Sequence, residues 1–311
     1  NKNMKIVFMG TPGFALRILE ALNNQYDVEL VVTQPDKPVG RRKEIIFNPV
    51  KKFALDKNLN LLQPDKLKDN HQAVETLKSI NPDIVCVAAY GKILPEEILD
   101  IPKYGCINVH ASILPKYRGA APINWSLING EKETGITIMK MDSGMDTGNI
   151  ISSHKIKIND DDDTLMLTEK LSILSAKKIV EFINNLVLNG SYESKSQNEN
   201  EATLAPKIKK EDALIDWQKD AEGIRNLIRG CNPWPVAHTH FKDQIIRIFK
   251  VSLDNSSNIN PGQIANKDGR LIVGCGQGSI EIFEIQRSGQ KRLSGKEFLN
   301  GISNIETPIF N

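Results

Sequence analysis

The chain has 311 residues, of which 40% are apolar and 25% charged, and its formal net charge is +2. This composition is typical of a globular protein long enough for two domains, and no apolar stretch approaches the length of a membrane-spanning helix. The balanced charge neither requires nor excludes a nucleic-acid partner. The first residues lack the layout of a secretory signal, and residues 1–3 are expected to be a cloning remnant ahead of Met4.

The first part of the chain alternates between short apolar runs and amphipathic segments. Apolar runs rich in β-branched residues predict strands at 5–9, 28–33, 83–89 and 106–110. Helical spacing of apolar residues predicts helices at 14–24, 49–57 and 70–80. Strands that alternate with helices favour the α/β class, with a doubly wound, mostly parallel, Rossmann-like sheet.

Two further strands are expected at 135–141 and 149–158, followed by a long helix at 163–187. The acidic run from Asp160 to Asp163 lies directly in front of that helix. Such a run can bind a cation, but carboxylates are also favoured at a helix start, where they accept backbone hydrogen bonds and complement the helix dipole. We interpret the run as a helix cap.

The composition changes after the long helix. Residues 190–205 are polar and aperiodic, which is typical of a linker. A helix at 221–230 and alternating strands at 244–253, 270–276 and 279–286 then predict a small β-rich domain, an OB-like barrel. The expected bounds are 4–190 for the first domain, 191–208 for the linker and 209–311 for the second domain.

The four cysteines are far apart and form no C-x-x-C pair. Cys86, Cys106, Cys231 and Cys275 are therefore expected to be buried free thiols in a cytoplasmic protein. His238 and His240 alternate on an expected strand, but no third ligand lies near them, so no metal site is predicted.

A polar pair ends the apolar run at 106–110. In an open parallel sheet, ligands bind at the carboxyl ends of the strands. Asn108 and His110 are two residues apart, so they project from the same face of the strand. An amide and an imidazole in this position could stabilise an oxyanion and move a proton. The alternative, a hydrogen-bonded core Asn and His that close the strand, is equally compatible with these two residues alone.

The loop at 141–148, Met-Asp-Ser-Gly-Met-Asp-Thr-Gly, favours the catalytic interpretation. Two glycines and two carboxylates after a strand suit a turn that approaches a ligand. Asp146 is the expected partner of His110, because a neighbouring carboxylate fixes the tautomer of an imidazole and favours its protonated form. Asp142 could instead only cap backbone amides of the turn.

These motifs carry a resemblance to a known family. The pattern Asn108-x-His110-x-Ser112-Ile-Leu-Pro115-x-Tyr117-Arg-Gly119, with the 141–148 loop about twenty residues later, resembles the folate-dependent formyltransferases. The resemblance implies that Asn108, His110 and Asp146 are catalytic and that 10-formyltetrahydrofolate is the formyl donor. It also implies a folate pocket at the same sheet edge, lined by Tyr90, Gly91, Ser112, Ile113, Leu114, Pro115 and Asp142. Tyr90 is equally compatible with stacking on the pterin and with a place in the core.

Other motifs resemble the family members that act on methionyl initiator tRNA: FMGTPGFA, TQPDKPVGR, VAAYGKILP, DTLMLTEKL and CNPWP. In those members a basic loop after the second strand reaches the acceptor stem, which implies tRNA contacts for Arg41, Arg42 and Lys43. The β-rich domain is then expected to bind the tRNA, and the protein to be a monomer without a membrane partner. Residues 232–235 are expected to form a packed corner rather than a platform for base stacking.

Other functions are compatible with parts of the sequence. A nicotinamide dehydrogenase would share the opening strand, turn and helix, but Gly10-Thr-Pro-Gly13 is not G-x-G-x-x-G. A non-catalytic RNA-binding protein would have no use for the polar trio. Within the family, the acceptor could be an amino-sugar nucleotide or glycinamide ribonucleotide, or the protein could be a formylfolate hydrolase. The basic loop and the C-terminal motif favour tRNA.

Overall fold

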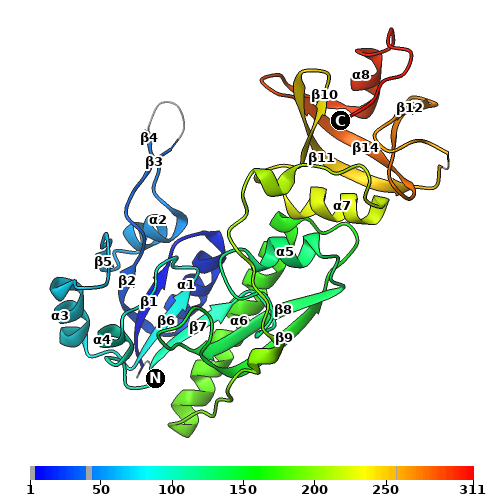
Figure 1. Cartoon of the computed structure of the whole chain (residues 1–311). Coiled ribbons are helices and arrows are strands. Elements are labelled where there is room, and N and C mark those ends of the chain that lie inside the picture. Colours follow the sequence, from blue (N-terminus) through cyan, green and yellow to red (C-terminus); the bar gives the residue numbers. More distant parts are fainter. Residues whose placement is uncertain (1–3, 40–43, 257) are drawn as a thin grey trace. The chain divides into compact units, whose positions relative to one another are not determined.

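Residues 4–39, 44–256 and 258–311 are described by a computed structural model, and the chain divides into two compact units (Figure 1). The first unit contains the residues up to 122 together with 133–156 and 168–206. The second contains 123–132, 157–167 and the residues from 207 onward. The second unit thus includes two short segments that come earlier in the sequence than the rest of it. The functional division at 191–208 stays a prediction.

The first unit is built on a seven-stranded sheet in the order β5-β2-β1-β6-β7-β8-β9. Its strands are β1 (Lys5–Gly10), β2 (Asp27–Val32), β5 (Leu61–Leu62), β6 (Ile84–Ala88), β7 (Cys106–His110), β8 (Glu133–Lys140) and β9 (Asn149–Lys157). β5, β2, β1, β6 and β7 are parallel, and β8 runs antiparallel to β7. The predicted doubly wound, mostly parallel sheet is confirmed.

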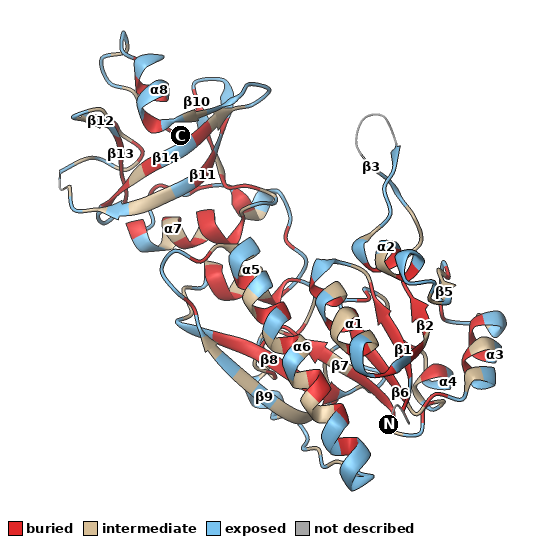
Figure 2. Cartoon of the chain, turned by 180° about the vertical axis from the view of Figure 1, so that it is seen from behind, coloured by how far each residue is buried: buried red, intermediate tan, exposed pale blue. Residues whose placement is uncertain are grey.

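Helices cover both faces of this sheet (Figure 2). They are α1 (Gly13–Gln25), α2 (Pro49–Asp56), α3 (His71–Ile80), α4 (Glu96–Leu99) and α6 (Thr164–Asn189). α3 and α4 bury Leu77 and Ile98 against Val7 of β1 and Val85 of β6. On the opposite face α1 and α6 are joined by an Arg17–Glu169 ion pair. The longer predicted helices are confirmed, whereas the four-residue α4 is too short to show a period.

The acidic run in front of α6 forms a helix cap. Asp163 directly precedes the helix, and its Oδ1 accepts a hydrogen bond from the Met166 amide at 2.8 Å. Asp162 is buried, and its Oδ2 accepts from the Asn159 amide at 2.8 Å. These bonds satisfy amides at the helix start and in the turn before it, so the capping interpretation is confirmed.

The second unit contains a curled antiparallel sheet in the order β10-β11-β14-β13-β12, with β15 beside β14. Its elements are α5 (Pro122–Ile128), α7 (Ala221–Gly230), β10 (His238–Phe241), β11 (Gln244–Asp254), β12 (Ile264–Lys267), β13 (Arg270–Gly274), β14 (Ser279–Arg287), β15 (Arg292–Ser294) and α8 (Gly295–Asn300). The predicted β-rich domain is confirmed, as a half-barrel.

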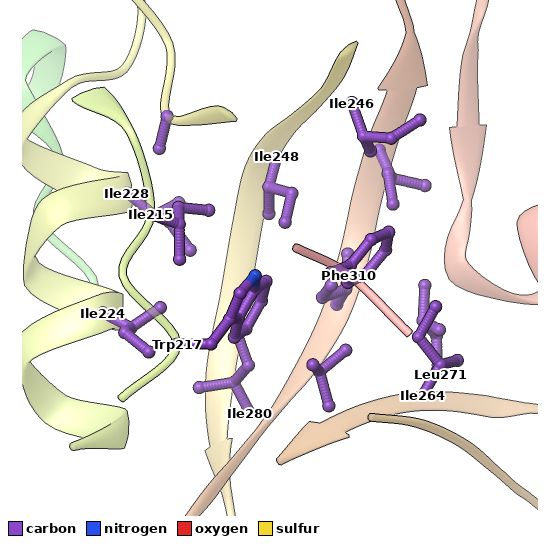
Figure 3. Close-up of a cluster of buried hydrophobic side chains, with 14 of the residues drawn as sticks. Ile215, Trp217, Ile224, Ile228, Ile246, Ile248, Ile264, Leu271, Ile280 and Phe310 are labelled. Carbon is purple, nitrogen blue, oxygen red and sulfur yellow. The ribbon is translucent and has the colours of Figure 1, made fainter. Parts of the chain in front are cut away.

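An aromatic and aliphatic core fills this unit (Figure 3). Trp217 stacks on Phe310 with ring centroids 5.6 Å apart, and its Nε1 donates to Thr239 Oγ1 at 2.9 Å. The buried indole is therefore both packed and hydrogen-bonded. In contrast, Trp234 is 52% exposed, so the expectation of a packed corner at 232–235 was wrong for its ring. The core is instead reached by the residues on either side, Cys231 and Val236.

The remaining compositional expectations concern thiols, membranes and metals. All four cysteines are buried and free, as predicted, and burial raises the pKa of the Cys106 thiol to about 12. Among the helices that the structure describes, none is long and apolar enough to cross a bilayer. The described residues also contain no cluster of three or more His, Cys, Asp or Glu side chains arranged to hold a metal ion.

Candidate active site

The end of β7 positions Asn108 and His110. Asn108 lies opposite Val87 of β6 and Met139 of β8, and His110 lies opposite Thr137 of β8. The strand is held on both sides, so the two side chains occupy fixed positions on one face. His110 is 7% exposed. The Asn108 side-chain oxygen is buried and has no hydrogen-bond partner among the described residues. This unpaired oxygen does not fit a core Asn whose role is to close the strand.

The loop between β8 and β9 brings Asp146 to His110. The distance from Asp146 Oδ1 to His110 Nδ1 is 3.6 Å. Asp146 Oδ2 accepts a hydrogen bond from the Gly119 amide at 2.8 Å. Gly119 has φ +119°, and a Cβ there would lie 2.8 Å from the Ala205 carbonyl oxygen, so only glycine fits this position. The carboxylate is thus fixed by a backbone donor while it faces the imidazole.

The second ring nitrogen of His110 also faces an acceptor. His110 Nε2 lies 2.8 Å from the Tyr117 carbonyl oxygen. A neutral imidazole carries one N–H, so only the protonated ring can donate toward both the carbonyl and the carboxylate. The site therefore places an oxygen atom beside each nitrogen of this ring.

The predicted folate residues at 112–115 form a tight turn supported by β8. Ser112 is fully buried, and its hydroxyl donates to the Lys116 carbonyl at 2.6 Å. Thr137 Oγ1 donates to the Ser112 carbonyl at 2.7 Å and accepts from the Leu114 amide at 3.0 Å. Leu114 is buried, whereas Ile113 and Pro115 are partly exposed. Of these four side chains, Ile113 and Pro115 are the accessible ones.

The other predicted folate residues lie in two neighbouring loops. Tyr90 is 2% exposed in the core beneath α3 and α4, and its hydroxyl has no partner within the described part of the chain. Burial raises the pKa of this phenol to about 12, so the hydroxyl stays neutral. Gly91, which follows it, is exposed with φ +83°. Asp142 Oδ1 accepts from the Gly144 amide at 3.0 Å and from Thr147 Oγ1 at 2.7 Å, as expected of a residue that caps the turn. Folate contacts by these residues stay predictions.

The residues predicted to contact tRNA, Arg41, Arg42 and Lys43, lie outside the described residues. The chain on either side of them pairs as a short antiparallel ladder of β3 (Pro38–Val39) and β4 (Glu44–Ile45). The next residues, Ile46 and Phe47, are 60% and 46% exposed. The described residues on either side of the predicted basic loop thus form a short ladder, which two-residue strands do not reveal in the sequence.

Three polar residues of the site carried no recognised role in the sequence. Arg118 is 6% exposed and donates to both carboxylate oxygens of Glu199, at 2.8 and 2.7 Å. Gln197 donates from its amide nitrogen to the Asp146 carbonyl oxygen at 2.7 Å. Arg118 lies in a recognised motif, but Gln197 and Glu199 lie in the aperiodic stretch that we expected to be a linker. No periodicity marks such a segment as part of a site.

The fold and the site together define an α/β group-transfer enzyme with an amide, an imidazole and a carboxylate at the carboxyl edge of its sheet. A family model described as formyl transferase matches residues 4–183, and another, described as formyl transferase, C-terminal domain, matches residues 207–303. The chain belongs to the formyl transferase family, which confirms the resemblance seen in the sequence. A methionyl-tRNA formyltransferase of Caldanaerobacter subterraneus subsp. tengcongensis is 49% identical over 300 residues, which cover 96% of this chain and 97% of that protein.

Two solved structures share the fold. A sugar 3N-formyl transferase, WlaRD, in the presence of dTDP and 5-N-formyl-THF has a TM-score of 0.66 at 22% identity, covering 93% of this chain and 99% of that chain. HypX from Aquifex aeolicus in complex with tetrahydrofolic acid has a TM-score of 0.65 at 15% identity, covering 99% of this chain and 51% of that chain. At these identities the likeness supports the architecture alone.

Proposed function

We propose that this protein transfers the formyl group of 10-formyltetrahydrofolate to the α-amine of methionyl initiator tRNA. The observation that carries the proposal is the contact between His110 and Asp146 beside Asn108, in a chain that is 49% identical to a methionyl-tRNA formyltransferase over nearly the length of both. Asn108, His110 and Asp146 support formyl transfer as the reaction. The high identity to a methionyl-tRNA formyltransferase over nearly the whole chain supports methionyl-tRNA as the acceptor.

Asn108 is suited to stabilise the oxyanion. When the amine nitrogen attacks the formyl carbon, the carbonyl oxygen gains negative charge, and a fixed amide N–H beside it lowers the barrier. Asn108 is held in the middle of the sheet, so little reorganisation is needed. The donor proposed for the oxyanion is the Nδ2 group of Asn108. The Asn108 side-chain oxygen is an acceptor without a protein partner among the residues described, so it can accept a hydrogen bond from a substrate N–H.

His110 and Asp146 are suited to different tasks. Both nitrogens of the His110 ring face protein oxygens, so the ring acts as a fixed positive neighbour of the oxyanion. The Asp146 side chain is 16% exposed against 8% for His110, and each of its oxygens has a further lone pair. Asp146 accepts the proton from the attacking amine and donates it to the folate nitrogen as the carbon–nitrogen bond to the donor breaks. The products are the formylated amine and tetrahydrofolate.

The folate donor fits the surroundings of the trio. Ile113 and Pro115 offer accessible apolar contact on a turn that Thr137 holds, and apolar walls with a few polar groups suit a flat pterin. Tyr90 follows β6 at the same sheet edge, but its hydroxyl is buried in the core, so a contact with the pterin would require this side chain to move. The residues present therefore fit a pterin, with no metal required by the proposed steps.

The acceptor is proposed from the relatives that are methionyl-tRNA formyltransferases and from the basic residues at 41–43. Arg41, Arg42 and Lys43 are proposed to contact phosphates of the acceptor stem, and the second unit to bind the body of the tRNA. The protein would work as a cytoplasmic monomer, which size-exclusion chromatography with light scattering can check.

The test is a formylation assay with the purified chain, 10-formyltetrahydrofolate and initiator tRNA charged with methionine. Uncharged tRNA is the control for the acceptor amine, and a dTDP-linked amino sugar and glycinamide ribonucleotide are offered in parallel. Formyl-methionine released from the tRNA supports the proposal. Formylation of the sugar nucleotide or of glycinamide ribonucleotide, with methionyl-tRNA left unmodified, would overturn it in favour of another acceptor.

A further inference from the structure

A hydrogen-bond network joins the polar stretch after α6 to the turn that carries Asp146. Gln197 is at its centre. The amide nitrogen of Gln197 donates to the carbonyl oxygens of Asp146 at 2.7 Å and Gly148 at 2.8 Å. The side-chain oxygen of Gln197 accepts from Arg118 Nε at 3.1 Å and Nη2 at 2.8 Å. Both donors of the side-chain amide are used, and its acceptor is bound by a guanidinium.

Arg118 determines which way the Gln197 amide points. Arg118 is buried and also binds both carboxylate oxygens of Glu199, so its planar guanidinium is fixed from two sides. A guanidinium has no acceptor, so it can contact only the oxygen of the Gln197 amide. The NH₂ group must then face the turn, where two backbone carbonyls accept its protons.

The backbone at Asp146 needs such support. Asp146 has φ +56°, a left-handed conformation that is uncommon for residues with a side chain, although Asp adopts it more readily than most. The turn ends at Gly148, where a Cβ would lie 1.9 Å from the Lys140 carbonyl oxygen. The two carbonyls that Gln197 binds bracket this strained part of the turn. Without those bonds, the turn is free to relax to a commoner backbone conformation, and the carboxylate would leave its place 3.6 Å from His110.

We infer that Gln197 is a positioning residue for the reaction: it holds the Asp146 turn so that the carboxylate stays beside His110. The residue does not touch the reacting atoms. Arg118 orients Gln197, and Glu199 in turn fixes Arg118. The segment around Gln197 is therefore a working part of the active site. The inference deepens the proposed function and rests on it, because the Asp146 carboxylate matters only if it takes part in formyl transfer.

The test replaces Gln197 by glutamate, which keeps the acceptor for Arg118 and removes both donors to the turn. The matched control is Gln72→Glu, the same chemical change at an exposed position of α3. Gln197→Met, which has a similar shape and no donors, is the second variant, and thermal denaturation compares the folded state of all three. Formyl transfer to methionyl-tRNA is measured in steady state and in single turnover.

We expect Gln197→Glu and Gln197→Met to lower kcat roughly 10- to 100-fold, as the loss of two hydrogen bonds allows, with both KM values within about threefold of wild type. In a chain that already carries Asp146→Asn, either substitution of Gln197 should lower kcat by less than about threefold, because the carboxylate that Gln197 positions is already lost.

Three results would overturn the inference: activity equal to that of Gln72→Glu, raised KM values with an unchanged kcat, or the same fold loss with and without Asp146. Failure of the wild-type chain to formylate methionyl-tRNA would instead refute the proposed function.

Discussion

Replacement of Asp146 by asparagine tests the proposed chemistry most directly. The change preserves the shape of the side chain and an oxygen for the Gly119 amide, but it removes the negative charge beside His110. At a separation of 3.6 Å, a full positive charge on the imidazole and the carboxylate charge would interact by about 4.6 kcal/mol at an effective dielectric constant of about 20, and this is the upper limit of what the carboxylate can contribute to the transition state. A dielectric constant of this size applies because the two side chains are only 8% and 16% exposed.

Since a factor of ten in rate corresponds to about 1.4 kcal/mol, loss of this interaction in the transition state should lower kcat by more than tenfold and by at most about 10³-fold. Single-turnover formylation of methionyl-tRNA measures the effect, and the KM for folate should change little. Asp69→Asn is the matched control, because Asp69 is exposed and has φ +55°, close to that of Asp146. A kcat within tenfold of wild type would refute both the charge interaction and the role of Asp146 as proton carrier.

Three further outcomes are expected. Asn108→Ala should lower kcat by about 10²- to 10³-fold, the usual effect of losing one oxyanion donor, while folate binding measured by fluorescence titration stays near wild type. Arg41→Ala should raise the KM for methionyl-tRNA, leave folate affinity intact and reduce the salt slope of tRNA binding by about 0.9; an unchanged slope would exclude a phosphate contact. Asp163→Ala should lower the free energy of unfolding by about 1 kcal/mol through loss of the α6 cap, whereas Asp161→Ala, at an exposed neighbour, should not; urea denaturation compares the two.

The sequence predicts the elements that are long enough to show a period. β7 and α7 occur at the residues expected, and α1, α3 and α6 differ from expectation by a few terminal residues. The two-residue strands β3, β4 and β5 and the one-turn helix α4 were not predicted, because a segment of two to four residues contains no full hydrophobic period. The sequence did not predict that residues 123–132 and 157–167 belong to the second unit. Composition changes only once along the chain, so it marks one boundary and cannot show that earlier segments pack with the C-terminal part.

Some residues of the candidate site could be predicted from the local sequence, and others could not. Asn108 and His110 could be placed on one face because a strand alternates, and the glycines around Asp146 marked a turn. The support of that turn comes from Gln197, fifty-one residues away along the chain. A single glutamine in a polar stretch has no period and no motif of its own, so its contact with Asp146 depends on how β9 and α6 return the chain to the sheet edge.

This division has a physical reason. A strand in mid-sheet gains its position from ladder hydrogen bonds on both sides, so residues such as Asn108 need little other support. A carboxylate on a loop has no ladder, and its position must be fixed by bonds from other segments. Asp146 receives one bond to its side chain from Gly119 and one to its backbone from Gln197, and both donors belong to segments that Arg118 joins. Asp146 is thus held beside His110 by segments 27 and 51 residues away along the chain. If the proposed role of Asp146 holds, substitutions in the 195–205 segment should affect catalysis more than stability.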